Sequence, residues 1–406
     1  MKHLSFIICG CGQRGTWLVQ NVISDLADVS IAALCDPYED KAESLADWLA
    51  EKGHARPKVY TDHVRMMDEV GGDAVLDATA WEMHVPVAVD AMHRGIAVAM
   101  EVGGAYNEEE CRELIRVQKE TGTPFMMMEN CCYGKEELLA TSLARNGKFG
   151  EIVFCQGAYA HDLRSEIAYG EKLRHYRLRN YQSRNCENYP THELGPIARL
   201  LNITRGNRMV RLSSFASKAC GLRDYIREKE DLAHLRDTVF AQGDIVETLI
   251  TCENGELIRL RLDTTLPRYY SRDFTVRGTK GLYNQDANMV ILDGVEFTES
   301  LKENIDSAER YEQYLPKIWR DVDPEILKKG HGGMDWFVFD AFVDALREGK
   351  PMPIDVYDAT AWMCITYLSE LSIKNGGAPV QIPDFTDGAY RDRAPVDIVE
   401  FPTVCD

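Results

Sequence analysis

The sequence predicts an α/β protein of two domains. Residues 1–128 are expected to form a doubly wound parallel sheet of the Rossmann type, and residues 129–406 an α+β domain with a large, mainly antiparallel sheet. Three observations predict this. The chain has 406 residues and is 45% hydrophobic, enough for two cores. Short apolar runs alternate with amphipathic stretches up to about residue 128. Longer β-rich runs follow.

Five apolar runs in the first part are expected to be strands, because they are nearly continuous in apolar residues, as in a parallel sheet buried on both faces. They cover residues 4–10, 29–36, 73–79, 95–101 and 123–129. Between them, segments 38–53 and 107–122 carry apolar residues at helical spacing and close with glycine, which favours helices.

The second part begins with a helical pattern at 135–150 and continues with β-rich runs at 151–160, 208–219, 244–267 and 271–284. Asn254 and Gly255 separate two alternating runs, which predicts a hairpin with a type I′ turn. Helical patterns return at 332–350 and 356–377, and the polar tail is expected to lie as a strap on the surface.

The charge balance argues against a polyanionic partner. The formal net charge is −19, so the field of the chain would repel nucleic acid, and a small neutral ligand fits better. No secretion signal is evident and no apolar run reaches about 18 residues, so we expect a cytoplasmic protein without a membrane partner. Twelve cysteines, mostly single, are expected to be reduced, and no metal-binding spacing is present.

A dinucleotide site is predicted after the first strand. Gly10, Gly12 and Gly15 form a GxGxxG pattern that opens a helix, where glycines let the backbone approach a pyrophosphate. The second strand ends at Asp36, whose carboxylate can accept hydrogen bonds from ribose hydroxyls and would repel a 2′-phosphate. NAD is therefore favoured over NADP. Two further strand ends fall on the same sheet edge, at Trp81 to His84 and at Glu101.

This order of domains resembles the superfamily of glucose-fructose oxidoreductase, inositol dehydrogenase and rhizopine catabolism proteins. Within it, the motifs "MENCCYG", "GAYAHDLR", "ENYPTHELGP", "HGGMDWF" and "PIDVYDATAW" resemble glycoside hydrolase family 109, the NAD-dependent α-N-acetylgalactosaminidases. The sequence departs from the superfamily's usual Glu-Lys-Pro, because Val102 and Gly103 follow Glu101. The usual catalytic lysine of the superfamily's dehydrogenases is thus absent.

The resemblance implies the site residues. The implied NAD contacts, with the glycines above, are Gln13, Arg14, Asp36, Trp81, Glu82, Met83, His84, Glu101, Val102, Asn130 and Tyr189. The implied sugar contacts are Tyr159, Arg177, Tyr189 and Tyr270. The surroundings of Arg177 and Tyr270 depart from the family pattern, which leaves the sugar least defined.

The implied reaction is hydrolysis through a redox cycle. NAD oxidises the sugar hydroxyl at C3, a base removes the acidified C2 proton, and the leaving group departs from C1. Water then adds at C1, and C3 is reduced again. Pro190 is expected to start a helix with Tyr189 at its cap and His192 one turn inward, where the dipole favours neutral imidazole. We expect His192 to serve at C3, and Tyr159 and Tyr270 to share the remaining proton transfers.

Alternatives stay open at this point. The chain could be a related redox glycosidase with other sugar or anomer specificity, a sugar dehydrogenase that releases NADH, or a catalytically inactive sensor of NAD and a sugar. His331 is left as either a helix cap or a pocket residue. For a glycosidase, the expected partner is a small glycoside substrate. A homo-oligomer, either a dimer or a tetramer, is expected by analogy with the superfamily.

Overall fold

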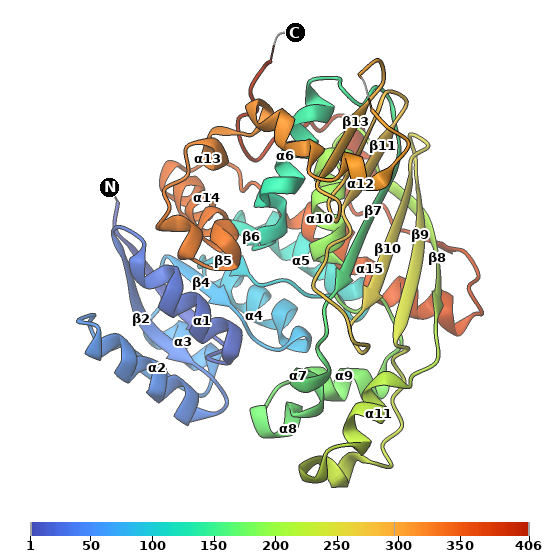
Figure 1. The fold of residues 1–406 in the computed structure, drawn as a ribbon. Coiled ribbons are helices and arrows are strands. Elements are labelled where there is room, and N and C mark those ends of the chain that lie inside the picture. Colours follow the sequence, from blue (N-terminus) through green and yellow to red (C-terminus); the bar gives the residue numbers. More distant parts are fainter. Residues whose placement is uncertain (1, 296, 405–406) are drawn as a thin grey trace. The chain divides into compact units, whose positions relative to one another are not determined.

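The computed structural model describes residues 2–295 and 297–404. The chain forms two compact units (Figure 1). The first unit comprises Met1–Asn130 and Asp323–Thr360, and the second comprises Cys131–Val322 and Ala361–Asp406. This division differs from the expected one at 128/129, because the segment 323–360 packs with the N-terminal residues.

The first unit contains a six-stranded parallel sheet in the order β3-β2-β1-β4-β5-β6. The strands are β1 (Leu4–Cys9), β2 (Val29–Cys35), β3 (Lys58–Tyr60), β4 (Ala74–Asp77), β5 (Ala97–Met100) and β6 (Phe125–Met127). The helices between them are α1 (Gln13–Asn21), α2 (Glu39–Glu51), α3 (His63–Glu69), α4 (Trp81–His93) and α5 (Glu108–Thr121). The predicted doubly wound sheet is confirmed. Strand β3 was not predicted, because three residues carry too little periodicity.

Local sequence signals explain where these helices start and stop. The side chain of Asn107 caps α5 by accepting the N–H of Glu110, and Gly122 ends it with a φ of +65°. Three glutamates occupy the first turn of α5, where the helix dipole favours negative charge. Leu114 and Val117 on its inner face are fully buried.

Helix α14 (Met334–Glu348) returns to the first unit from late in the chain. The ring of Phe342 meets Phe6 of β1 edge-on, with ring centroids 6.1 Å apart. Arg347 donates to the backbone oxygen of Lys2 at 3.1 Å, and Met127 of β6 donates its N–H to Ile354 at 3.2 Å. The Rossmann core is thus completed by residues about 330 positions beyond its first strand.

The second unit contains an eight-stranded sheet in the order β13-β12-β11-β7-β10-β9-β8-β14. All pairs are antiparallel except β10 with β7. The strands are β7 (Ile152–Ala160), β8 (Met209–Ala216), β9 (Ile245–Cys252), β10 (Leu257–Asp263), β11 (Thr275–Gly278), β12 (Gly281–Asn284), β13 (Met289–Leu292) and β14 (Val380–Gln381).

The helices of the second unit include short ones at its loops. They are α6 (Lys135–Arg145), α7 (Arg164–Ala168), α8 (Gly170–Leu173), α9 (Arg177–Ser183), α10 (Thr191–Leu200), α11 (Gly221–Arg227), α12 (Leu301–Asn304), α13 (Lys317–Arg320) and most of α15 (Val356–Lys374). The predicted large, mainly antiparallel sheet is confirmed. No helix among the described residues is long and apolar enough to cross a bilayer.

The hairpin between β9 and β10 is confirmed, but its predicted type I′ turn is wrong. Of the turn residues, only Gly255 has a positive φ, +102°, whereas type I′ needs two. Gly255 donates its N–H to Cys252 at 3.2 Å, and Cys252 donates to Glu256 at 2.9 Å. Asn254 is held instead by Asn207 and Gly206 of a neighbouring loop. The contact of Asn254 with this neighbouring loop therefore determines the conformation of the turn.

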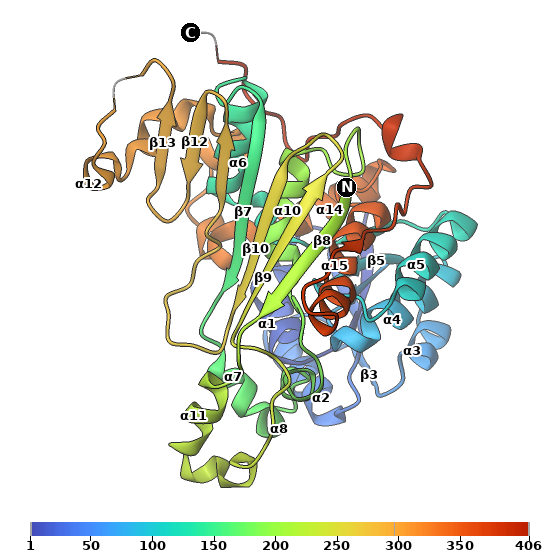
Figure 2. The same ribbon diagram turned by 90° about the vertical axis from the view of Figure 1, so that its right-hand side faces the viewer.

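One face of the second sheet is covered and the other is open (Figure 2). In that view β7, β10, β9 and β8 lie in front of α10. Helix α15 packs on the same side as α10, since the hydroxyl of Ser372 accepts the N–H of Ser214 in β8. On the open side, Phe215 is 58% exposed and Leu249 is 45% exposed.

Candidate active site

The glycine turn after β1 has the shape that a dinucleotide phosphate requires. Gly10 has a φ of +93°, and a Cβ there would lie 2.3 Å from the oxygen of Ala78. A Cβ on Gly15 would lie 1.9 Å from the oxygen of Gly10, so helix and strand pack without a side chain between them. A Cβ on Gly12 would meet nothing within 4 Å. The backbone at the start of α1 is therefore open to a ligand.

Asp36 lies directly after β2, as predicted, and is buried. Its carboxylate accepts the N–H of Cys11 at 2.8 Å and the N–H of Tyr38 at 2.9 Å. These bonds fix the carboxylate against the glycine turn. Each oxygen keeps a second lone pair for a ribose hydroxyl.

Trp81, Glu82, Met83 and His84 form the first turn of α4, just beyond β4. The Nε2 atom of His84 is 3.1 Å from the backbone oxygen of Thr79. Burial lowers the pKa of His84 to about 4. The imidazole is therefore neutral. Its buried Nδ1 has no protein partner. Gly103 lies against both rings, because a Cβ there would be 2.8 Å from Trp81 Cδ1 and 3.0 Å from His84 Nδ1.

Arg14, Glu101 and Asn130 come together around a residue that sequence reasoning missed. The guanidinium of Arg14 contacts Glu101 Oε1 and both oxygens of Asp335, with all three distances 2.9 Å. Asn130 donates to Asp335 Oδ1 at 2.7 Å. Asp335 lies within the quoted motif "HGGMDWF", but nothing in its spacing indicates a partner more than 200 residues earlier. Val102 is buried beside Glu101.

The "NYPTHELGP" stretch forms the entrance to α10. The helix begins at Thr191 with Pro190 as its N-cap, one residue later than predicted. Tyr189 therefore precedes the cap instead of occupying it, and His192 lies in the first turn. Leu194 donates its N–H to the oxygen of Pro190 at 2.9 Å, so the proline carbonyl receives the first helical bond.

Three rings pack together at this helix start. The ring centroids of Tyr159 and Tyr189 are 4.5 Å apart, those of Tyr189 and His192 are 4.8 Å apart, and those of Tyr159 and His192 are 5.6 Å apart. Tyr159 comes from the end of β7. The sequence-predicted residues of this unit are thus neighbours.

Tyr270 joins the cluster through His161, which sequence reasoning missed. The ring of His161 lies edge-on to Tyr159 at 6.0 Å and to Tyr270 at 5.2 Å. Tyr270 is 45% exposed, and Arg272 lies 6.0 Å from its ring centre. Arg272 is itself bound by the buried Glu137 at 2.5 Å. His161 stands in "GAYAHDLR", two positions after Tyr159, and this alternation along a strand end was the signal available.

Arg177 begins α9 and is buried. Its Nε lies 2.8 Å from Glu166 Oε1, and its Cζ lies 4.9 Å from the ring centre of Tyr189. The predicted arginine is therefore part of the aromatic cluster, with Glu166 as a counter-ion that sequence reasoning did not identify.

Burial controls the protonation of this cluster. It raises the pKa of Tyr159 to about 12, against the opposing effect of Arg177, and it also raises the pKa of Tyr270. Burial and the charge of Arg177 lower the pKa of His161. At neutral pH the two tyrosines are protonated donors and His161 is a neutral acceptor.

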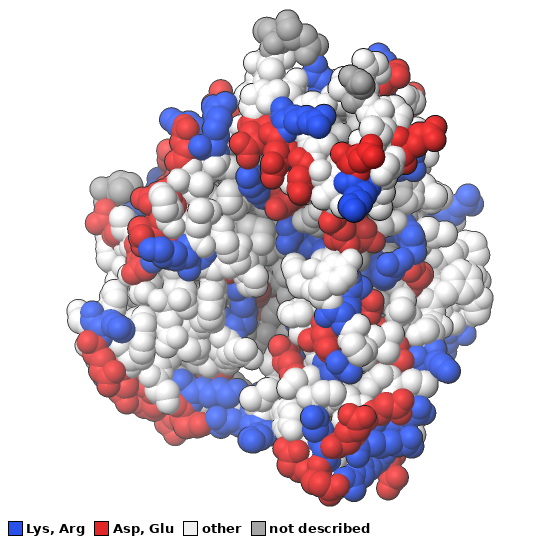
Figure 3. Space-filling view, viewed as in Figure 1, with Lys and Arg blue, Asp and Glu red and all other residues white. Residues whose placement is uncertain are grey.

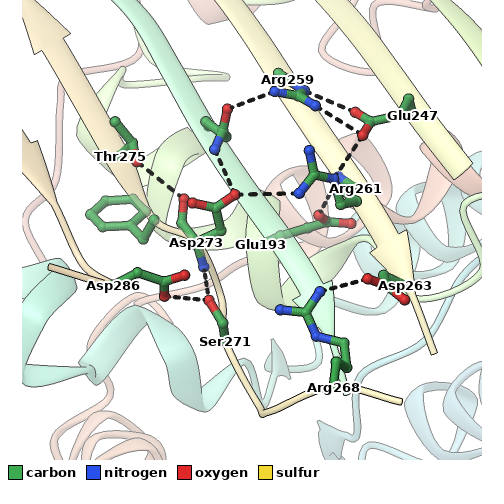
Figure 4. A network of polar contacts seen from close by, with 12 residues as sticks. Glu193, Glu247, Arg259, Arg261, Asp263, Arg268, Ser271, Asp273, Thr275 and Asp286 are labelled. Carbon is green, nitrogen blue, oxygen red and sulfur yellow. Dashed lines mark hydrogen bonds and ion pairs between the residues drawn. The ribbon is translucent and has the colours of Figure 1, made fainter. Parts of the chain in front are cut away.

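Two buried carboxyl groups, Glu187 and Glu193, lie behind the rings. Burial raises the pKa of both, and the neighbouring Glu187 carboxylate raises that of Glu193 further. Glu193 also accepts the N–H of Arg261 at 3.0 Å (Figure 4). A Cβ on Gly157 would lie 2.8 Å from the oxygen of Glu193, so α10 packs directly on β7. The raised pKa values favour the neutral, protonated form of both carboxyl groups.

Comparison with known proteins identifies the family. Residues 133–392 match the model of the glycosyl hydrolase 109 C-terminal domain, and residues 4–129 match the oxidoreductase family model of the NAD-binding Rossmann fold. The chain belongs to glycosyl hydrolase family 109. The resemblance read from the motifs is thereby confirmed, and this family 109 member is an NAD-dependent glycosidase.

Relatives of this family 109 chain match nearly its full length. A glycosyl hydrolase family 109 protein of Stenotrophomonas maltophilia is 38% identical, with 97% of this chain and 92% of the relative covered. An α-N-acetylgalactosaminidase of Tannerella forsythia is 37% identical, with 97% and 88% covered.

Solved structures share the fold. Myo-inositol 2-dehydrogenase of Lactobacillus plantarum superposes with a TM-score of 0.67 at 16% identity, with 94% of this chain and all of that chain covered. Scyllo-inositol dehydrogenase of Lactobacillus casei, solved with NAD(H) and scyllo-inositol, gives 0.66 at 13% identity, with 94% and 99% covered.

Proposed function

We propose that this family 109 glycosidase hydrolyses α-N-acetylgalactosaminides by a cycle of oxidation, elimination, water addition and reduction. The observation that carries the proposal is the packing of Tyr159, Tyr189 and His192, with Arg177 on one side and Tyr270 reached through His161. The proposed substrate is that of the 37% identical relative, the α-N-acetylgalactosaminidase of Tannerella forsythia. Bound NAD supplies the reversible oxidation of a sugar hydroxyl.

The residues of the cluster divide the proton transfers among them. His192 takes the proton of the C3 hydroxyl. Tyr159 and Tyr270 share the other two transfers: one takes the C2 proton and the other protonates the leaving group. Both are protonated at neutral pH, which suits the donor to the leaving group. His161 contacts both tyrosine rings edge-on and is neutral, so it packs between the two phenols without adding a charge. Arg177 stabilises negative charge that develops on the sugar.

We also propose the cofactor contacts. The open backbone at Gly12 and the N–H group of Gln13 hold the pyrophosphate together with the side chain of Arg14, and Asp36 holds the adenosine ribose. The remaining contacts come from the sheet edge and the helix entrance: Trp81, Glu82, Met83, His84, Glu101, Val102, Asn130 and Tyr189.

An NMR time course tests the reaction. Purified protein is mixed with NAD and an aryl α-N-acetylgalactosaminide in D2O, and sugar release and the C2 proton of the product are followed. Free sugar with deuterium at C2 and no accumulation of NADH is the expected result. Release with the C2 proton retained would exclude elimination. Accumulation of NADH without release would identify a dehydrogenase, and release from other sugars or β-anomers only would change the substrate.

Partners and compartment remain part of the proposal. Basic and acidic side chains are interspersed on the face shown in Figure 3, and the net charge is −19, which suits a small neutral glycoside better than nucleic acid. Cys9 and Cys35 are register neighbours on β1 and β2 and are free thiols, as expected in the reducing cytoplasm. We propose neither a membrane partner nor a metal.

A homo-oligomer is proposed through the open face of the second sheet. This face carries the half-exposed Leu249 and Phe215 beside a charged network (Figure 4). Glu247 binds both Arg259, at 2.8 Å, and Arg261, at 2.7 Å. Exposed apolar side chains beside fixed charges are typical of a surface that a partner covers.

A further inference from the structure

Asp335 occupies an unusual position in the first unit. It lies in the first turn of α14, and its side chain is completely buried. Its two oxygens receive donors from three separate segments of the chain. Arg14 donates to both oxygens at 2.9 Å, Asn130 donates to Oδ1 at 2.7 Å, and His331 Nδ1 lies 2.8 Å from Oδ2.

The charge balance keeps Asp335 ionised. Burial acts to raise its pKa, but Arg14 and His331 outweigh burial and hold the pKa of Asp335 well below its usual range. Arg14 is shared, because its Nε also donates to Glu101 Oε1 at 3.1 Å. The planar guanidinium is therefore fixed by carboxylates from two directions, and its rotamer is fixed by those contacts.

The loop before α14 is shaped to bring Asp335 to this place. A Cβ on Gly330 would lie 1.9 Å from Trp17 Cη2 and 2.2 Å from Asp335 Oδ2, so only glycine fits there. His331, Gly332 and Gly333 all have positive φ values, of 45°, 67° and 102°. The ring of His331 lies 5.9 Å from Trp17, on α1. The loop thus runs directly over the helix that starts at the glycine turn.

We propose that Asp335 is a positioning residue for bound NAD: by fixing Arg14 and Asn130, it sets how tightly the enzyme retains the cofactor. The inference rests on the cofactor contacts proposed above, which include both residues. Asp335 does not itself touch the cofactor in this proposal. It orients two side chains that follow different strands, Arg14 after β1 and Asn130 after β6.

The test compares Asp335→Asn with Asp25→Asn. Asp25 forms an exposed ion pair with Lys329, in the same loop, but it has no contact with Arg14 or Asn130. NAD carried through purification is measured after denaturation, and the dissociation constant of NAD is measured by calorimetry on protein stripped of cofactor. We expect about a 10- to 100-fold weaker affinity for Asp335→Asn, since hydrogen bonds to charged groups are lost. Asp25→Asn is expected to bind like wild type.

A coupling experiment separates positioning from a general loss of stability. If Asp335 acts through Arg14, the effects of Asp335→Asn and Arg14→Lys on NAD affinity will not add in the double variant. Additive effects, or an unchanged NAD affinity in a less stable Asp335→Asn, would overturn the inference. Should Asp335→Asn fail to fold, His331→Ala removes the half-exposed imidazole, with its contacts to Asp335, Asn130 and Trp17, and is expected to weaken NAD binding about threefold. Unchanged affinity there would also overturn it.

The wild type separates the two proposals. NAD binding by wild type is compared with that by Arg14→Lys. If the wild type binds no NAD, the proposed cofactor contacts are refuted. Wild-type protein that binds NAD tightly, with Asp335→Asn equally tight, would refute only the role of Asp335.

Discussion

At the scale of single residues, the candidate site depends on groups whose protonation is set by burial. Tyr159 is 6% exposed and lies between His192, Tyr189 and Arg177. Burial raises the pKa of its hydroxyl to about 12. A phenol held protonated at this point is suited to donate a proton, and removing only its oxygen leaves the ring packing intact.

Tyr159→Phe is therefore expected to lower kcat/KM by about 10²- to 10⁴-fold, the usual contribution of a general acid or base. The melting temperature should change little. The measurement is the steady-state release of an aryl glycoside. Tyr283→Phe is the matched control, since Tyr283 is a buried tyrosine of β12 in the same sheet, outside the cluster. Full activity of Tyr159→Phe would remove this residue from the mechanism.

The buried carboxyl pair leads to a prediction about pH. Burial raises the pKa of Glu187 to about 8 and raises that of Glu193, whereas an unfolded glutamate titrates near about 4.3. The folded chain therefore holds protons that the unfolded chain has released. Stability is greatest at low pH in this range and falls as pH rises from about 4.3 to about 8.

Glu187→Gln should remove much of this pH dependence and raise the melting temperature above pH 8, by about 2–4 °C for each kcal/mol recovered. Thermal unfolding measured from pH 5 to pH 9 checks it. Glu151→Gln, on an exposed loop of the same unit, controls for the loss of one carboxylate. An unchanged slope in Glu187→Gln would show that the pair does not titrate in this range.

The individual site residues also show which parts of the site could be predicted from the sequence. The predicted residues of the second unit lie in one cluster: Tyr159, Arg177, Tyr189, His192 and Tyr270. Tyr159, Tyr189 and His192 stand in quoted motifs, whereas Arg177 and Tyr270 were implied by the resemblance in segments that depart from the family pattern. His161, Glu166 and Asp335 were missed. The spacing of His161 from Tyr159 was an available signal, but the roles of Glu166 and Asp335 depend on partners that only the fold brings close.

At the scale of elements, different glycines of the GxGxxG turn serve two functions: one allows helix α1 to pack on strand β1, and another leaves room for the ligand. Gly15 lets α1 approach β1, since a Cβ there would lie 1.9 Å from the oxygen of Gly10. Gly12 faces open space, so its missing side chain is needed by the ligand and not by the fold.

Gly12→Ala is therefore expected to leave the melting temperature of the cofactor-free protein unchanged and to weaken NAD binding. Gly15→Ala should lower the melting temperature as well, because overpacking costs about 1–3 kcal/mol. Differential scanning fluorimetry with and without NAD distinguishes the two. Equal destabilisation by both variants would contradict this division of roles.

Elements also mark the limit of prediction from sequence. The long buried strands and the helices with caps were predicted, because periodicity and capping are local. Strand β3, with three residues, and β14, with two, were not. The turn at Gly255 departs from type I′ because Asn207 holds Asn254, and such a contact cannot be read from the two turn residues alone.

At the scale of the whole molecule, the open face of the second sheet is expected to be covered by another copy of the chain. Phe215→Asp combined with Leu249→Glu should shift the assembly toward monomer, because both charges would be buried without partners. Light scattering coupled to size-exclusion chromatography measures the mass. As a control, Val239→Asp changes an 83% exposed side chain on a loop of the same unit. A monomeric wild type would refute the proposed assembly.

The return of residues 323–360 to the first unit has a consequence for synthesis. A ribosome releases the six strands of the Rossmann sheet first, yet Phe342, Asp335 and the backbone of Ile354, which complete that unit, are made about 200 residues later. The second unit can gather most of its strands before the first one is finished. A nascent chain therefore acquires a complete first unit only after residues 323–360 have been made, and truncation after residue 322 leaves that unit unfinished.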